Sequence, residues 1–466
     1  MISFLRHISR HKIILIIVTA YLILFTSIKF NQHLSFQTDG DTSIFVQALW
    51  NTLHGNFFYS TFDNISLLRV HSAYILFLIL PIYALIPSPL TLMFIQVFIV
   101  SLSAILLYFL CLDLFKSQKI SIMVTFAYMF SPFLIKAILY EFHFEVFFPL
   151  LIFSIFLAYR KQAYFFFYLS IALLLTVKEN AFVYVVMIGI YLLINKKYKM
   201  SLITISSGIL WGIFIFLIIP SIFDNIPPFY RQSANYQYLG NNVIGILKTA
   251  FGLPAILVTN ERIMSVVNIF STVIFIPLFS PVSLLLVLPP LLANLMSMVT
   301  YQYNLACHYS LDVLPFLYIS TIYGITNIAS IVNKESARKT IFTLSLIIML
   351  ISLFTGPIGI IKIIYKNKFK VTEHHKFIDK TIDLIPIDSK VCAQLLIVSH
   401  VANRKILSVF PNINNADYVL LDTTEGIWPS NRVLYNNCVS EILKDDKYST
   451  LISSEGFLML KKKYGK

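Results

Sequence analysis

Charged side chains are scarce in this sequence: Asp, Glu, Lys and Arg make up 12% of its 466 residues, while 58% are hydrophobic. Soluble domains carry about 25% charged residues, so this composition excludes an ordinary soluble protein. The hydrophobic residues form runs long enough to cross a lipid bilayer, and the mean hydropathy is +0.78. The sequence therefore predicts a multi-pass membrane protein whose first partner is the lipid bilayer.

Acidic residues are the scarcer charge, with 22 Asp and Glu against 36 Lys and Arg, for a net charge of +14. In a soluble chain this excess would suggest nucleic acid, but no clustered basic and aromatic surface accompanies it. We therefore expect no nucleic-acid partner. In a membrane protein, Lys and Arg hold cytoplasmic loops against the anionic leaflet, so the basic residues indicate the topology.

Cysteine is rare as well, and the four residues Cys111, Cys307, Cys392 and Cys438 lack metal-ligand spacing. A disulfide between Cys392 and Cys438 is open if they lie outside the cytoplasm, although nothing in the sequence requires it. The chain also lacks a glycine-rich phosphate loop, a zinc-type histidine pair on one helix, and a nucleophile elbow. Function must therefore be inferred from a constellation of residues rather than from a soluble-enzyme motif.

The N-terminal apolar run, which extends to residue 30, follows Arg6, Arg10 and Lys12. It is too long for a signal-peptide core and no small-residue cleavage site follows it, so we expect an uncleaved span with a cytoplasmic N-terminus. The first external loop then carries apolar residues at helical spacing over 44–53, which predicts an interfacial helix. The run 72–86 contains Pro81 and is short for a span, so it predicts a second interfacial or re-entrant helix.

About eleven apolar runs are expected to be spans of an all-α polytopic membrane domain over residues 1–364. Threading them places the four later basic clusters inside, whereas counting 72–86 as a span would place those clusters outside, against the positive-inside rule. The expected spans are 12–30, 89–115, 120–139, 146–159, 163–177, 181–194, 201–219, 263–279, 282–299, 311–332 and 341–364.

Composition changes after residue 364, where charged and apolar residues mix. The pattern predicts a small extracytoplasmic α/β domain over residues 365–466. Its expected strands are 391–393, 406–409 and 418–421, its expected helices are 377–384, 395–402 and 433–443, and a terminal hairpin is expected over 451–460.

The same threading brings most of the external acids, imidazoles and one lysine to a single face. Ionisable groups in or near the membrane are costly, so they are candidates for function. These residues are Asp39, Asp41, His71, Glu141, His143, Glu145, Lys178, Glu179 and His308.

Each of these residues also has a purely structural interpretation. Asp39 and Asp41 precede a helix and can cap it, as Thr42 or Ser43 can. Glu141 and Glu145 would share one face of a helix, with His143 off that face, and could simply be solvated. Lys178 and Glu179 read as an isolated ion pair at a helix boundary, and His71 as a hydrogen-bonded histidine.

Several stretches resemble a known family. They are Asp41-x5-Gln47-Ala48-Leu49-Trp50-Asn51-Thr52-x-His54-Gly55, His71, Leu80-Pro81-Ile82-Tyr83-Ala84-Leu85, Gln96, Glu141-Phe142-His143, Lys178-Glu179-Asn180-Ala181, His308-Tyr309-x5-Pro315-Phe316 and Ala416-Asp417-Tyr418-Val419-Leu420-Leu421-Asp422. Together they resemble the predicted membrane proteins grouped as domain of unknown function 2079. Two departures are Ser43, where family members often have Gly, and Asn180, where Asp is common.

That family is similar to the GT-C glycosyltransferases. The similarity implies a GT-C-like fold for residues 1–364, a sugar donor on a polyprenyl phosphate, and acidic residues in the external loops. By position, Asp41 (or Asp39) would be the first acid and Glu141 the second, and both would hold a divalent cation if one takes part. The resemblance further implies substrate-binding roles. The residues concerned are Gln47, Trp50, His71, His143, Glu145, Lys178, Glu179, His308 and Tyr309.

Two other functions stay open. A transporter or flippase of a lipid-linked or polar substrate would place ionisable groups near the bilayer midplane and show inverted repeats, and the sequence has neither feature. A non-catalytic relative that binds a glycolipid would need the same surface without the chemistry. We therefore expect a glycosyltransferase of the cell membrane, acting at its external face.

Overall fold

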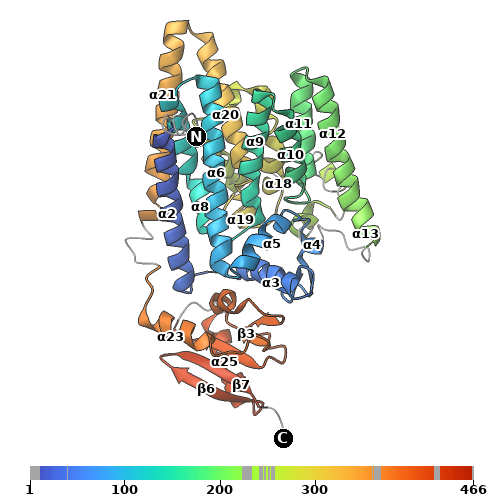
Figure 1. Cartoon of the computed structure of the whole chain (residues 1–466), viewed down its shortest axis with the longest axis vertical. Coiled ribbons are helices and arrows are strands. Elements are labelled where there is room, and N and C mark those ends of the chain that lie inside the picture. Colours follow the sequence, from blue (N-terminus) through green and yellow to red (C-terminus); the bar gives the residue numbers. More distant parts are fainter. Residues whose placement is uncertain are drawn as a thin grey trace. The chain divides into compact units, whose positions relative to one another are not determined.

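The computed structural model describes residues 11–38, 40–222, 234–240, 245, 248–249, 252, 258–358, 360–361, 369–424 and 431–463. The chain, shown in Figure 1, divides into two compact units. Unit 1 comprises Met1–Phe25, Val70–Ile75 and Gln96–Tyr365. Unit 2 comprises Thr26–Arg69, Leu76–Ile95 and Lys366–Lys466, so it joins most of the first loop to the C-terminal segment.

The fold is mostly helical, and in the described residues five helices are long and apolar enough to cross a membrane. Four of them are α2 (Lys12–Leu34), α6 (Pro89–Phe115), α20 (Val313–Ile331) and α21 (Lys334–Thr355). The fifth is a continuous helix over Tyr198–Ile222, which is made of α12 (Tyr198–Ile213), η2 (Phe214–Ile218) and α13 (Ile219–Ile222). A sixth is reached if α7 (Gln118–Met129) and α8 (Pro132–Leu139) form one span, bent by 50°. The chain is therefore a membrane protein with five or six candidate spans.

The expectation of about eleven spans is not confirmed, because several expected runs are broken or short. Proline explains the bend at residues 130–132, since Pro132 has no amide hydrogen to continue the helix before it. The run 263–279 is interrupted where Ile274 and Phe275 adopt positive φ angles. The resulting elements are α9 (Phe147–Lys161), α10 (Tyr164–Leu175), α11 (Ala181–Ile194), α16 (Asn260–Ser271), η5 (Ile276–Phe279), α17 (Pro281–Leu284), α18 (Leu288–Leu295) and α19 (Thr300–Tyr303).

Helices α9, α10, α11 and α12 pack side by side within unit 1 (Figure 1). Helix α20 packs on α9, α21 and η5. Gly324 allows the approach to η5, because a Cβ atom there would lie 2.4 Å from the carbonyl oxygen of Ile276. Helix α20 is thereby held in the middle of unit 1, and the residues just before its first turn are held with it.

Two short helices of the first loop belong to unit 2, and they match the two expected interfacial helices. Helix α3 (Asp41–Leu53) covers the run 44–53, and α5 (Leu76–Leu85) covers most of 72–86 with Pro81 inside it. Between them lie turns, the antiparallel pair β1 (Tyr59–Ser60) and β2 (Ile65–Ser66), and the short helix α4 (Leu67–Val70). Their position at the membrane interface stays a prediction.

The C-terminal part of unit 2 contains a five-stranded sheet in the order β4-β3-β5-β7-β6. Strands β3 (Val391–Ala393), β4 (Leu407–Val409) and β5 (Tyr418–Asp422) are parallel, and β6 (Tyr448–Ser454) and β7 (Phe457–Lys462) add an antiparallel hairpin. The expected strands, hairpin and helices are all present. The helical elements are α23 (Glu373–Ile382), α24 (Leu395–Val398), η6 (Ser399–Val401) and α25 (Arg432–Lys444).

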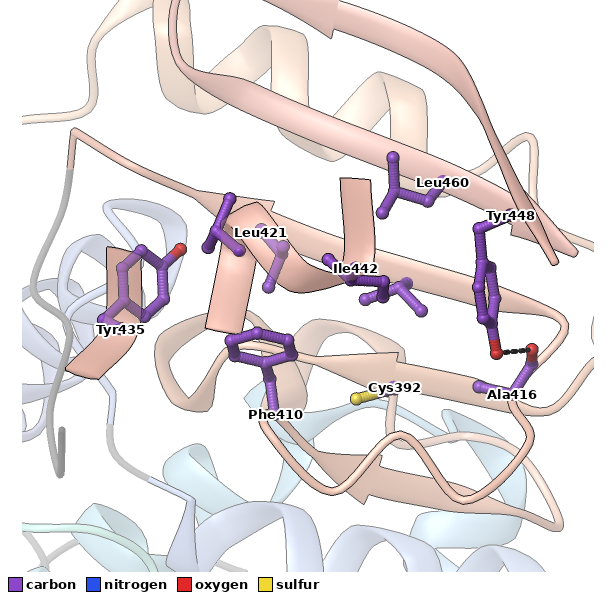
Figure 2. Close-up of a cluster of buried hydrophobic side chains, with 10 residues drawn as sticks. Cys392, Phe410, Ala416, Leu421, Tyr435, Ile442, Tyr448 and Leu460 are labelled. Carbon is purple, nitrogen blue, oxygen red and sulfur yellow. Dashed lines mark hydrogen bonds between the residues drawn. The ribbon is translucent and has the colours of Figure 1, made fainter. Parts of the chain in front are cut away.

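The core of this sheet lies between its strands and α25 (Figure 2). Tyr435 and Ile442 of α25 belong to one buried cluster with Phe410 and Leu421. The Tyr448 hydroxyl donates a hydrogen bond of 2.9 Å to the carbonyl oxygen of Ala416, which satisfies its polar end in the apolar surroundings. The apolar face of α25 thus explains why this segment folds on the sheet.

All four cysteines lie in the described part of the chain, and none of them forms a disulfide there. Cys392 is fully buried in β3 and Cys438 packs against the same cluster from α25. The disulfide that the sequence left open is therefore not present.

Within unit 2, hydrogen bonds connect helix α3 to the C-terminal segment. The side-chain amide of Gln47 donates to the carbonyl oxygens of Arg404 and Lys405, both at 3.3 Å. Thr38 and Ser399 share a hydrogen bond of 2.9 Å, and Tyr83 of α5 donates to Asn403 at 2.5 Å. The first loop and the tail are consequently one folded body.

Candidate functional site

Charged residues and histidines gather inside unit 1 at the ends of apolar helices. Glu145 lies in the single turn η1 (Phe144–Val146), and Lys178 and Glu179 lie in the turn between α10 and α11. His308 lies in the turn that leads to α20. We call the following residues the charge cluster: His71, His143, Glu145, Lys178, Glu179 and His308.

The segment before η1 differs from the expectation of a helix that presents Glu141 and Glu145 on one face. Helix α8 ends at Leu139, Tyr140 is extended, and residues 141–143 are not helical. Because this segment is not helical, the spacing of four residues does not place Glu141 and Glu145 on one helix face. Instead, His143 is the residue that lies beside Glu145, with its Nδ1 atom 3.6 Å from Oε2.

Glu141 is buried, with 1% of its surface exposed, so it is not a solvated loop end. Its backbone carbonyl oxygen accepts a hydrogen bond of 3.2 Å from the side-chain amide of Gln96. The same amide donates to the carbonyl oxygen of Ala137 at 3.1 Å. Gln96 of α6 therefore holds the frayed end of α8, which positions the chain for η1.

Glu145 is the centre of the charge cluster. Lys178 Nζ donates to its Oε1 atom at 2.8 Å, and His308 Nε2 lies 3.7 Å from the same oxygen. The rings of His143 and His308 are stacked, with centroids 3.6 Å apart. Three groups that can be cationic thus surround one buried carboxylate.

Electrostatics favour the ionised form of Glu145 in spite of its burial. Burial by itself would raise the pKa of this carboxyl, but Lys178, His308 and His143 together hold the pKa well below its usual range. For Lys178, burial opposes the charge, and Glu145 and Glu179 raise the pKa of its ammonium group. The two side chains therefore form a buried ion pair, whose strength depends on both partners being present.

Lys178 and Glu179 are not the isolated local pair that their adjacency suggests, because each side chain turns to a different partner. Glu179 Oε1 lies 3.4 Å from His71 Nδ1, and Oε2 accepts from the backbone amide of Ser72 at 3.3 Å. Burial would raise the pKa of Glu179, and the nearby His71 lowers it overall. Glu179 therefore ties the segment of His71 to the start of α11.

A second polar network, beside the charge cluster, was not predicted from the sequence. Asp312 is buried directly before α20, where it accepts hydrogen bonds from Tyr184 at 2.7 Å and from Asn294 at 3.3 Å. Asn180 donates in turn to the Tyr184 hydroxyl at 2.9 Å. The signal was available, since an acid at the end of an apolar run is itself a candidate for function.

Burial raises the pKa of Asp312 to about 7, against the hydrogen bond from Tyr184 and the charge of Lys178, which lower it. The two side chains that donate hydrogen bonds to Asp312, Tyr184 and Asn294, are neutral, whereas Glu145 accepts one from the cation Lys178. Asp312 can therefore exchange a proton near neutral pH.

One group in the described part of the chain has the composition of a metal site. His143, Glu145 and His308 each offer a ligand atom, and these atoms all lie within 4.8 Å of one another. The expected cation ligands Asp41 and Glu141 are not members of this group. Tyr309 follows His308, with its ring centroid 4.1 Å from the imidazole.

The remaining expected site residues lie in unit 2. Asp41 is the first residue of α3, and the N-cap is Gly40, so Asp41 favours the helix dipole without capping the helix. Gln47 is engaged as described above, and Trp50 is buried and stacked on His54 with centroids 3.6 Å apart. Asp39 lies outside the described residues. The roles expected of these four residues stay predictions.

The sequence matches the model of one protein family. A family model described as predicted membrane protein (DUF2079) matches residues 32–459, which includes the charge cluster, α3 and most of the C-terminal sheet. The chain belongs to this family. No curated protein matches the chain. The family resemblance drawn from the motifs is thereby confirmed, and the similarity to GT-C enzymes remains a matter for proposal.

Proposed function

We propose that this membrane protein is a glycosyltransferase that moves a sugar from a polyprenyl-phosphate donor to an acceptor hydroxyl at the external membrane face. The observation that supports this proposal is the burial of Lys178 and Glu145 with two histidines at helix ends. Fixed cations in a water-poor site stabilise a phosphate leaving group. If these helices cross the bilayer, groups at their ends would lie near the depth of a lipid headgroup.

The proposed step is a displacement at the anomeric carbon of the sugar. The acceptor oxygen forms the new bond from one face while the bond between that carbon and the phosphate oxygen breaks on the other. The electron pair leaves with the polyprenyl phosphate, whose charge Lys178, with His71 or His308, would offset. The acceptor proton passes to a carboxylate, which the family resemblance assigns to Asp41, while Glu141 and Glu145 would hold the acceptor.

A transfer assay tests this function. Membranes that contain the protein are incubated with radiolabelled polyprenyl-phosphate sugars, and label leaving the lipid pool is measured. We expect Asp41→Asn to abolish transfer while the protein still folds and inserts, and Asp39→Asn to be milder. The matched control is Asp383→Asn, the same substitution at an exposed residue of unit 2, which should keep full activity.

Two results would count against the proposed chemistry. Full activity of Asp41→Asn would remove the assigned base. The protein would instead be a flippase if no label leaves the lipid pool, but labelled lipid moves between leaflets in membranes with the wild-type protein and not in membranes with the Asp41→Asn variant.

We further propose a topology of about eleven passes, with the N-terminus in the cytoplasm and residues 365–466 outside. The support is the positive-inside rule applied to the basic loops. One of the basic clusters to which the rule applies contains Lys334, Arg338 and Lys339, at the start of α21.

Cysteine labelling in intact cells checks this topology. In a background whose native cysteines are alanine, Ser440→Cys on the exposed side of α25 should react with a membrane-impermeant maleimide. The control Glu335→Cys, also at an exposed position, should react only after permeabilisation. The reverse pattern would show that the threading is inverted from the first short helix onward.

A further inference from the structure

We propose that His143, Glu145 and His308 bind a divalent transition-metal ion of the zinc class. His143 and Glu145 lie in one turn before α9 and His308 lies in the turn before α20, and their ligand atoms are already within 4.8 Å of one another. The site was not indicated by sequence spacing, because His308 is far along the chain from the other two ligands. Metal binding here stands independently of the glycosyl transfer proposed above.

The donor set selects the class of metal. Two imidazole nitrogens and one carboxylate oxygen suit zinc and its first-row neighbours, whereas magnesium and calcium prefer oxygen ligands alone. Three protein ligands also leave a coordination position for water or for an anionic oxygen, as in zinc sites that take part in chemistry. The site therefore combines metal binding with a place for a ligand such as a phosphate.

A buried oxygen without a hydrogen bond gives a second, independent indication. Glu145 is 3% exposed, and its Oε2 atom has no hydrogen-bond partner in the described part of the chain. This atom faces His143, whose Nδ1 is 3.6 Å away. A buried carboxylate oxygen normally has a partner, so an ion at this position would supply what the protein does not.

Lys178 is the competitor for this site. Its Nζ atom occupies the other oxygen, Oε1, at 2.8 Å. A metal bound through Oε2 leaves that ion pair intact but places two cations near each other, so Lys178 should weaken metal binding. Removing the ammonium group should strengthen the binding of zinc by more than about tenfold, because like charges a few ångströms apart repel strongly at the moderate dielectric of a buried site.

Zinc binding to the full-length chain in detergent tests the site, with a purification tag that contains no histidine. We expect one zinc per chain by elemental analysis, and nitrogen and oxygen ligands without sulfur in the X-ray absorption spectrum of the wild type. His143→Ala, Glu145→Gln and His308→Ala should each weaken binding at least about 100-fold, since even outer-shell changes cost 10–100-fold. Lys178→Met should bind zinc more tightly.

The matched control is His54→Ala, which removes an exposed histidine of unit 2 and should leave zinc binding unchanged. Absence of stoichiometric zinc in the wild type would overturn the proposal, as would a sulfur ligand in the spectrum. Equal affinities for His308→Ala and His54→Ala would overturn it too. Because zinc alone is the probe, these results do not depend on transferase activity, and a failed transfer assay leaves them unaffected.

Discussion

Replacing Lys178 by Met is expected to lower the free energy of unfolding by about 3–5 kcal/mol, the usual cost of removing one partner of a buried ion pair. The reason is that Glu145 would keep its charge although its side chain is only 4% exposed, and it would lose the ammonium group that pairs with it. Glu145→Gln should cost a similar amount, because it leaves the ammonium of Lys178 unpaired. Unfolding in detergent, followed by heat or denaturant, measures both effects.

A double-mutant cycle separates this pair from general damage. The double variant Lys178→Met/Glu145→Gln contains neither unpaired charge, so it should lose much less stability than the sum of the two single losses. The matched control is Lys339→Met, which breaks an exposed pair with Glu335 and should have no measurable effect. If Lys178→Met were as stable as Lys339→Met, the charge cluster would not be a buried ion-pair site.

The second large effect is a pH dependence that belongs to Asp312. Its pKa is raised from 3.8 to about 7 in the folded chain, chiefly by burial. Between these two values the folded state keeps the proton and the unfolded state does not, so stability falls by about 1.4 kcal/mol for each pH unit as pH rises. Above about pH 8 both states are ionised and the dependence ends.

The variant Asp312→Asn isolates this contribution. We expect its stability relative to the wild type to improve steadily from pH 5 to pH 7 and then to level off, as seen in unfolding curves measured at each pH. The control Asp388→Asn changes an exposed aspartate and should run parallel to the wild type. A difference between Asp312→Asn and the wild type that is constant from pH 5 to pH 8 would mean that Asp312 keeps an ordinary titration.

Local sequence patterns predicted many elements well, because hydrophobicity and helix propensity act over a few residues. The run 181–194 is α11 (Ala181–Ile194) at both ends, and the strand 391–393 is β3. The two short helices of the first loop were also present in the pattern. The expected number of about eleven spans is not confirmed, because prolines and positive φ angles break several apolar runs into shorter helices.

The site could be predicted only in part. Most of its members, including Glu145, Lys178 and His308, were predicted because placing an ionisable group in or near a membrane costs free energy and therefore indicates a function. The partners were assigned incorrectly, since adjacency paired Lys178 with Glu179 and helical spacing paired Glu141 with Glu145. In the structure Lys178 pairs with Glu145, and Glu179 with His71.

The sequence by itself determined that this chain is a membrane protein, which of its segments are helices or strands, and which ionisable residues are costly enough to need partners. Only the tertiary structure decided which partners they have, and that Asp312 and the stacked histidines belong with them. The physical reason is that hydropathy and periodicity depend on neighbours along the chain. A buried charge is stabilised by whatever group helix packing brings within about 4 Å of it, however distant that group is in sequence.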